Sequence, residues 1–236
     1  MKKFLNRFSF YGSQFTQIAF TLAETLIVIG ILGVVAALTL PNLNHATGDK
    51  ERITKVNKIY ASLTDAFDRA LAVYGPYDEW FSDTTVNATM PLRTGERLTE
   101  FMKTSKICKS GNDKSCFFTM QIEDSAYRFN LSDGTGIKIA DCNTSEDTCL
   151  IEVGIDGNKG KKWRGYDVFF FRIKKSSVEP VDIPWGASSL FNHNHVGSSR
   201  WIIDYGNMDY LKADETGKCD DNPSIILDGV TNTSCH

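Results

Sequence analysis

The chain has 236 residues and a formal net charge of −3, with 42% hydrophobic and 23% charged residues. This length suits one modest domain with appendages, and the apolar content is too high for a disordered chain. The acidic balance argues against a general nucleic-acid binder, because such proteins concentrate Lys and Arg.

Residues 1–19 form a basic leader that contains Lys2, Lys3 and Arg7 and no acidic residue. A basic segment before an apolar helix is typical of an end that stays in the cytoplasm. We therefore exclude this leader from the folded part of the mature protein.

Residues 20–40 are apolar except for one charged residue, Glu24. With a rise of about 1.5 Å per residue, a helix of this length is about 32 Å long, enough to cross the hydrocarbon core of a bilayer. A carboxylate in such a segment usually has a partner or a role. Gly33 and Ala37 have the spacing of small residues that lets helices pack closely. Pro41 follows the run and lacks the N–H that would bond the carbonyl of Ala37. We therefore predict a transmembrane and assembly helix over residues 20–41.

The segment Ala19-Phe20-Thr21-Leu22-Ala23-Glu24, followed by the apolar run and Pro41, resembles the cleavage and methylation signature of type IV prepilins and type II secretion pseudopilins. The match is close in this segment. The rest of the chain matches the family only in the order of its parts, a long helix followed by a β-rich head. Two residues depart from the family pattern, because Ala19 replaces the usual Gly and Ala23 replaces a bulky apolar residue.

This resemblance implies that a prepilin peptidase cuts between Ala19 and Phe20 and that Phe20 is then N-methylated. It further implies that Glu24, Gly33 and Pro41 take part in assembly. In filaments of the family, the helix can lose its regular structure between the positions that match Gly33 and Pro41.

The resemblance also implies a non-enzymatic subunit that joins other pilin or pseudopilin subunits through an inner-membrane assembly platform. We expect a single-pass protein of the bacterial inner membrane with its head in the periplasm or outside, which later enters an extracytoplasmic filament. A pilus, a secretion pseudopilus and a DNA-uptake filament remain open, as do a major and a minor subunit. The alternative is a membrane-anchored periplasmic binding protein or enzyme that acts alone.

Residues 42–75 are predicted to form the amphipathic second half of the same helix. Gly48-Asp49 is a candidate for a bend or break, and Gly75-Pro76 predicts the end of the helix. One face of this helix carries a stripe of apolar residues. Such a stripe must be buried, and we expect it to pack on a sheet. Its apolar residues recur at steps of three and four: Ile53, Val56, Tyr60, Leu63, Phe67, Ala70 and Tyr74.

Residues 76–236 are predicted to form a globular, β-rich head, so the fold class is α+β with a mainly antiparallel sheet. Turn-forming Gly and Asp residues separate the short strands. The aromatic residues Tyr74, Tyr77, Trp80 and Phe81 either cover the end of the helix, which we favour, or form an exposed binding surface. A short helix is predicted over 95–103, and strands are predicted over 117–122, 126–131, 135–140, 150–155, 168–173 and 201–205.

All six cysteines fall within the head, which indicates disulfides in an oxidising compartment. A zinc site is the alternative, although no C-x-x-C spacing is present. Short surface loops are closed by the pairings that the spacing favours: Cys108–Cys116, Cys142–Cys149 and Cys219–Cys235.

Three oxygen-bearing residues, Asp156, Asn158 and Asp167, are weak candidates for a calcium site, and no other cofactor is expected. His193 and His195 are a weaker metal candidate in a loop. Residues 159–175 are rich in Lys and Arg beside aromatic residues, which suggests either a solvated face or a site for a polyanion.

Overall fold

A computed structural model describes residues 22–81, 89–108, 115–116, 126–143, 145–181, 188–191, 195 and 197–236, without the side chains of 36–47. The chain divides into two compact units, residues 1–46 and 47–236, and each is described by itself. The predicted strand over 117–122 lies outside the described residues.

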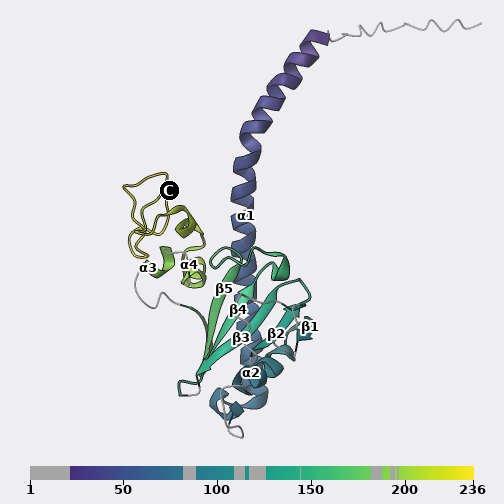
Figure 1. The fold of residues 1–236 in the computed structure, drawn as a ribbon, viewed down its shortest axis with the longest axis vertical. Helices are drawn as coiled ribbons and strands as arrows, with labels where there is room; N and C mark the ends of the chain where they lie inside the picture. The colour runs from purple at the N-terminus through teal and green to yellow at the C-terminus, as the bar shows by residue number, and fades with distance from the viewer. Residues whose placement is uncertain are drawn as a thin grey trace, which may run out of the picture. The chain divides into compact units, whose positions relative to one another are not determined.

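The longest element is α1 (Leu22–Tyr74), a helix of 53 residues that continues through Pro41 and Gly48-Asp49 without a break (Figure 1). It ends where the sequence predicts. Gly75 adopts a positive φ of 78° and donates its N–H to the carbonyl of Leu71 at 3.0 Å. This left-handed cap favours glycine, because a Cβ disfavours that conformation.

The expected single-pass location in the inner membrane is contradicted. Among the residues that the structure describes, no helix is both long enough and apolar enough to cross a bilayer. A crossing helix requires about 20 consecutive apolar residues.

The head contains a six-stranded antiparallel sheet in which each strand pairs with the next along the chain. The predicted α+β class with an antiparallel sheet is therefore confirmed. Four predicted strands are present as β2 to β5, whereas β1 and β6 were not predicted. The strands are β1 (Thr104–Cys108), β2 (Tyr127–Leu131), β3 (Gly136–Asn143), β4 (Thr148–Gly154), β5 (Val168–Lys174) and β6 (Ser177–Pro180).

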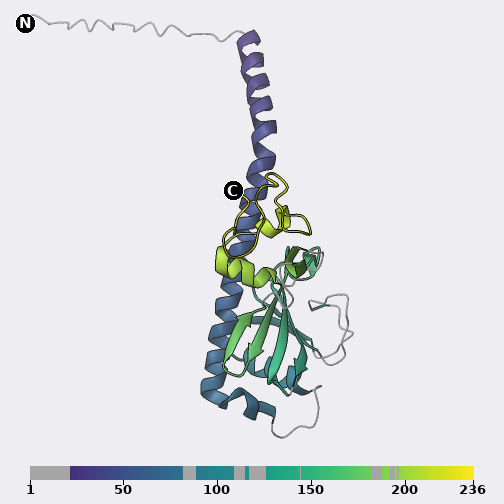
Figure 2. The ribbon, with the colours of Figure 1, turned by 90° about the vertical axis from the view of Figure 1, so that its left-hand side faces the viewer.

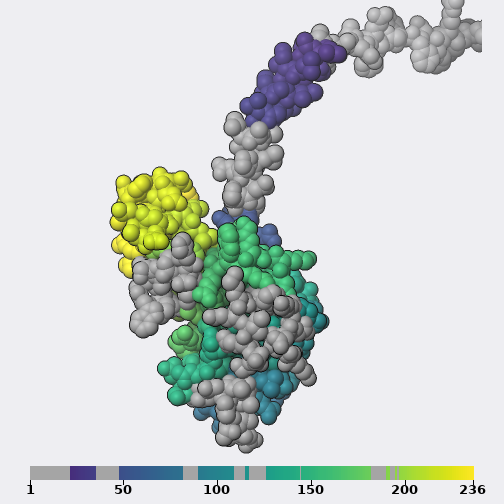
Figure 3. All heavy atoms as spheres, in the orientation of Figure 1, coloured from purple at the N-terminus to yellow at the C-terminus, as the bar shows by residue number. Residues whose placement is uncertain are grey.

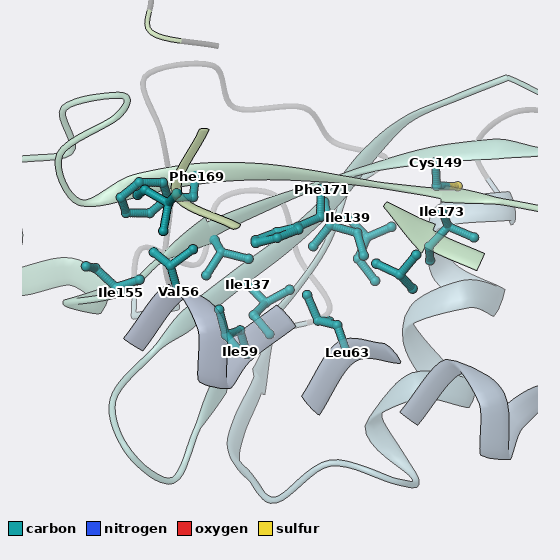
Figure 4. Close-up of a cluster of buried hydrophobic side chains, with 14 of the residues drawn as sticks. Val56, Ile59, Leu63, Ile137, Ile139, Cys149, Ile155, Phe169, Phe171 and Ile173 are labelled. Carbon is teal, nitrogen blue, oxygen red and sulfur yellow. The ribbon is translucent and has the colours of Figure 1, made fainter. Parts of the chain in front are cut away.

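The part of α1 that belongs to residues 47–236 lies along one face of this sheet (Figure 2). Alternate strand residues point to the helix because side chains alternate between the two faces of a strand. Figure 4 shows Val56, Ile59 and Leu63 of α1 facing this layer. The predicted apolar stripe is confirmed, since Val56, Leu63, Phe67 and Ala70 are fully buried. The sheet contributes Ile137, Ile139, Ile151, Val153, Phe169, Phe171 and Ile173 to the same core.

Short helices complete the fold, and the C-terminal segment forms the yellow surface in Figure 3. The helix predicted over 95–103 is present but begins and ends earlier. The strand predicted over 201–205 is wrong, because this segment is helical and is closed by Gly206 in a left-handed conformation. The helices are η1 (Tyr77–Phe81), α2 (Thr89–Thr99), η2 (Gly157–Lys159), α3 (Ser188–Phe191), α4 (Ser198–Tyr205) and η3 (Asp209–Lys212).

Candidate functional site

The first part of α1 exposes apolar side chains on every side of the helix. Their exposed fractions range from 52% at Val35 to 77% at Leu22. A helix that is apolar all round is normally buried, and a large exposed apolar surface marks a site of interaction. The exposed apolar surface of α1 consists of Leu22, Leu26, Ile27, Val28, Ile29, Ile31, Leu32, Val34 and Val35.

The residues with predicted assembly roles fall on or beside this surface. Glu24 is exposed in the first turn of α1, where the helix dipole favours a negative charge. Nothing lies within 4 Å of the position that a Cβ would take at Gly33, so another helix can approach the backbone there. Pro41 lies within the helical backbone, but its side chain is not described. The predicted cleavage site, Ala19 and Phe20, lies outside the described residues.

Three disulfides join the cysteines in the pairs that their spacing favours: Cys108–Cys116, Cys142–Cys149 and Cys219–Cys235. All six cysteines are used in this way, which leaves no thiolate as a zinc ligand. Each bridge closes a short segment of the head.

The three calcium candidates bind protein groups in this structure. Asp156 pairs with Lys55 at 2.9 Å, and the Asn158 amide donates to the carbonyl of Cys116 at 2.9 Å. Asp167 is 2% exposed and its carboxylate accepts two backbone N–H groups. No cluster of three potential metal ligands occurs among the described residues.

The histidine pair is described only at His195, since His193 lies outside the described residues. Nδ1 of His195 is 2.5 Å from the carbonyl oxygen of Leu190, and the ring packs beside that of Tyr210. His195 therefore has a structural role in joining two parts of the C-terminal segment.

The aromatic cluster at the end of α1 covers the helix end, as favoured from the sequence. Tyr77 and Trp80 are buried, and the Tyr77 ring packs edge-on against Phe67 and Phe81. Burial raises the pKa of Tyr77 above its usual value, and its hydroxyl bonds to that of Thr94 at 3.0 Å. These contacts make the cluster part of the core.

Two buried polar arrangements were not predicted from the sequence. Lys138 and Glu152 face each other across β3 and β4 with 3.4 Å between Nζ and Oε1. Asp209 is 4% exposed. Burial raises its pKa, but hydrogen bonds from Lys212, Cys235 and Ser234 outweigh this effect and lower it below the usual value. For the first arrangement, the sequence offered one signal, the opposite charges of Lys138 and Glu152. This signal could not be used from the sequence, because the two residues become neighbours only through the register of the two strands.

Comparisons of the chain with family models, with curated proteins and with solved structures give no match. The family resemblance of residues 19–41 thus stands on the sequence motif itself.

Proposed function

We propose that the chain is a prepilin-like subunit that is cleaved before Phe20, N-methylated and assembled into a type IV pilus or type II secretion pseudopilus filament. The observation that carries this proposal is the exposed apolar surface of α1, with exposed fractions of 52–77%. Its partner is the same surface on other copies or on related pilin-like subunits.

A helix that is apolar on all sides is covered only when several apolar neighbours surround it, as in the centre of a helical bundle. A filament provides such neighbours, because each copy presents the same surface to the next. The open space at Gly33 allows backbones to approach closely at that level. Repetition of one head-to-tail contact extends the assembly without closing it.

Glu24 supplies the register in this proposal. A carboxylate in a dry filament core is costly unless a cation pairs with it. Cleavage before Phe20 creates an amine, which keeps its positive charge after methylation. Pairing of Glu24 in one subunit with the Phe20 amine of its neighbour favours one axial step, because a displaced subunit buries an unpaired charge.

The substitutions Glu24→Gln and Glu24→Ala test this role. Both variants should be produced and cleaved, yet sheared preparations should contain no filaments when examined by electron microscopy with immunogold labelling. Thr25→Ala is the matched control, because Thr25 is also exposed and its hydroxyl donates to the carbonyl of Leu22 in the same helix at 2.9 Å. Normal filaments from the Glu24→Gln variant would refute the register role.

Mass spectrometry of the mature amino terminus tests processing separately. We expect a chain that starts at a methylated Phe20. A chain that retains Met1, or one that is cut after Leu40, contradicts the proposal and favours a protein that acts alone.

A further inference from the structure

Residues 156–167, in the loop between β4 and β5, carry several cations and an exposed indole ring. Trp163 is 60% exposed, and Lys159, Lys161 and Arg164 are exposed in the same loop, with the Arg164 guanidinium 5.4 Å from the Phe170 ring centroid. Nζ of Lys161 lies 4.7 Å from the Trp163 ring centroid. The loop lies at the end of the sheet in Figure 1, and atoms of this part of the chain are on the visible surface in Figure 3.

The acidic residues of this loop do not neutralise these cations. Asp156 pairs with Lys55 at 2.9 Å, and the Asp167 carboxylate accepts backbone N–H groups at 2.6 and 2.8 Å. Among the residues that the structure describes, no ion pair involves Lys159, Lys161 or Arg164. The loop therefore keeps a local positive charge in a chain whose net charge is −3.

The structure separates this loop from the rest of the basic run over 159–175. Lys174 pairs with Glu179 at 2.5 Å, and Lys175 pairs with Asp147 at 3.6 Å. The charges of Lys174 and Lys175 are therefore partly neutralised by these two carboxylates. The run is thus not one continuous stripe of unpaired charge, and three of its exposed cations, Lys159, Lys161 and Arg164, lie in the loop that carries Trp163.

The backbone of the loop is held in one conformation. The carbonyl of Trp163 accepts the N–H groups of Tyr166, Asp167 and Val168 at 3.1–3.2 Å. Lys162 has a positive φ of 61°, which is unfavourable for a residue with a Cβ. A Cβ at Gly160 would lie 2.4 Å from the Asp167 carboxylate. The loop therefore has one strained residue, Lys162, and one close approach that leaves no room for a side chain, at Gly160.

We propose that this loop binds single-stranded nucleic acid. A base stacks on the Trp163 indole, and Lys159, Lys161 and Arg164 bind the adjoining phosphates. Stacking on an exposed aromatic ring beside cations binds single strands with little dependence on base sequence. A duplex hides the faces of its bases, so the same loop discriminates against double-stranded nucleic acid. This binding site is independent of the proposed filament function.

The experiment uses the full chain and a fluorescent oligothymidine, with binding followed by fluorescence anisotropy at several salt concentrations. Trp163→Ala should weaken binding about tenfold, whereas Trp163→Phe should retain most of it. Lys161→Ala with Arg164→Ala should make the salt dependence shallower, by about 0.7 in logarithmic slope for each phosphate that is no longer neutralised. Lys174→Ala with Lys175→Ala is the matched control from the same basic run and should leave binding unchanged.

Circular dichroism verifies that each variant is folded. Three results of the titrations, and one result of a competition experiment, would overturn the proposal. The three are no binding of the oligonucleotide at about 50 mM salt, equal affinity for a duplex of the same length, and an affinity that does not depend on Trp163. If sulfated polysaccharide displaces the oligonucleotide equally from the Trp163→Ala variant and from the unchanged chain, the loop recognises charge alone, and this result also overturns the proposal.

Discussion

At the scale of single residues, one buried carboxylate holds the C-terminal end of the chain in place. The Asp209 carboxylate accepts hydrogen bonds from the ammonium of Lys212 at 2.7 Å, the hydroxyl of Ser234 at 2.8 Å and the N–H of Cys235 at 2.9 Å. These donors lie 3 to 26 residues away in sequence. Burial makes each bond matter more, because a donor that loses its acceptor there stays unsatisfied.

Asp209→Asn should lower the free energy of unfolding by about 2–3 kcal/mol at neutral pH. The amide keeps one acceptor oxygen but places an NH₂ group against donors that approach the other oxygen. Chemical denaturation followed by circular dichroism measures the loss. Asp221→Asn is the control, because Asp221 is exposed and should change stability by no more than about 0.5 kcal/mol.

The effect of Asp209 should depend on pH in a defined direction. Its pKa is lowered in the folded chain, so its stabilising effect is complete above the unfolded-state pKa and is lost as pH falls through the folded-state pKa. The stability difference between the unchanged chain and Asp209→Asn should therefore be constant above about pH 5 and shrink below about pH 4. A difference that grows on acidification contradicts this assignment.

Sequence reasoning found some functional residues and missed others for a physical reason. The cysteine pairs were predictable because each closes a loop of 7 to 16 residues, a local property of the chain. Asp209 gave no such signal, because an isolated aspartate resembles any surface acid, and Asp167 was noted only as a calcium candidate and not as a buried residue. Only the fold shows that these two side chains are 4% and 2% exposed.

At the scale of elements, α2 packs closely against β2 at Gly95. A Cβ at this position would lie 2.0 Å from Cδ1 of Tyr127, which is 4% exposed. Gly95→Ala should improve helix propensity by about 1 kcal/mol, but overpacking costs about 1–3 kcal/mol. Because a buried ring cannot easily move, we expect a net loss of up to about 2 kcal/mol in unfolding free energy.

Denaturant titration of Gly95→Ala beside Arg93→Ala separates packing from propensity. Arg93 is exposed on the same helix, so its replacement should stay within about 0.5 kcal/mol of the unchanged chain. A stabilised Gly95→Ala variant would show that helix propensity outweighs packing at this contact.

The contact between α1 and the sheet should be the most sensitive one in the head. Leu63 is fully buried at the centre of this contact, so Leu63→Ala should cost about 2–5 kcal/mol in unfolding free energy. Asp68→Ala, one turn further on the exposed side, is the control and should change little. Thermal unfolding followed by circular dichroism compares the two variants. Equal unfolding midpoints for Leu63→Ala and Asp68→Ala would contradict the importance of this packing contact.

The type of an element was predictable where its apolar residues recur with one period over a long segment. The apolar residues of α1 recur at steps of three and four over several turns, a pattern that a strand does not produce. This period predicted both the helix and the burial of its apolar face. The segment 201–205 was misread because five residues rich in Trp, Ile and Tyr fit a strand as well as a helix. The deciding signals were Gly206 as a helix cap and the pairing of Arg200 with Asp204 at the spacing of one helical turn.

At the scale of the whole molecule, the antiparallel arrangement was predictable because turn residues separate consecutive short strands. The edge strands were not, since β6 ends in Pro180 and β1 is largely polar. Edge strands depend least on an apolar pattern, because one side of their backbone lacks a partner strand.

The two proposed functions should be separable in the intact chain. Glu24 variants remove a charge from residues 1–46, whereas Trp163 belongs to residues 47–236. Trp163→Ala should therefore leave filament yield unchanged in electron micrographs, and Glu24→Gln should leave oligonucleotide affinity unchanged. Loss of oligonucleotide binding by the Glu24→Gln variant, or of filaments by Trp163→Ala, would contradict this independence.

The disulfide between Cys219 and Cys235 should contribute more to stability than its position near the chain end suggests. It closes a loop of 16 residues, and restricting the unfolded chain to such a loop is worth about 3 kcal/mol. Both cysteines are buried, and Cys235 also donates its N–H to Asp209 at 2.9 Å. Replacing both with Ala should thus lower unfolding free energy by about 3 kcal/mol and expose the last residues to proteases.

Limited proteolysis with mass spectrometry separates a local loss from a global one. If the bridge acts locally, cleavage in the double variant begins within 219–236, while the core around Leu63 keeps its protection against hydrogen exchange. Asp209→Asn should produce the same early cleavage, because the carboxylate and the bridge fix the same segment from two sides. Early cleavage in the sheet instead would mean that the C-terminal segment stabilises the whole head, and the local role of this disulfide would then be wrong.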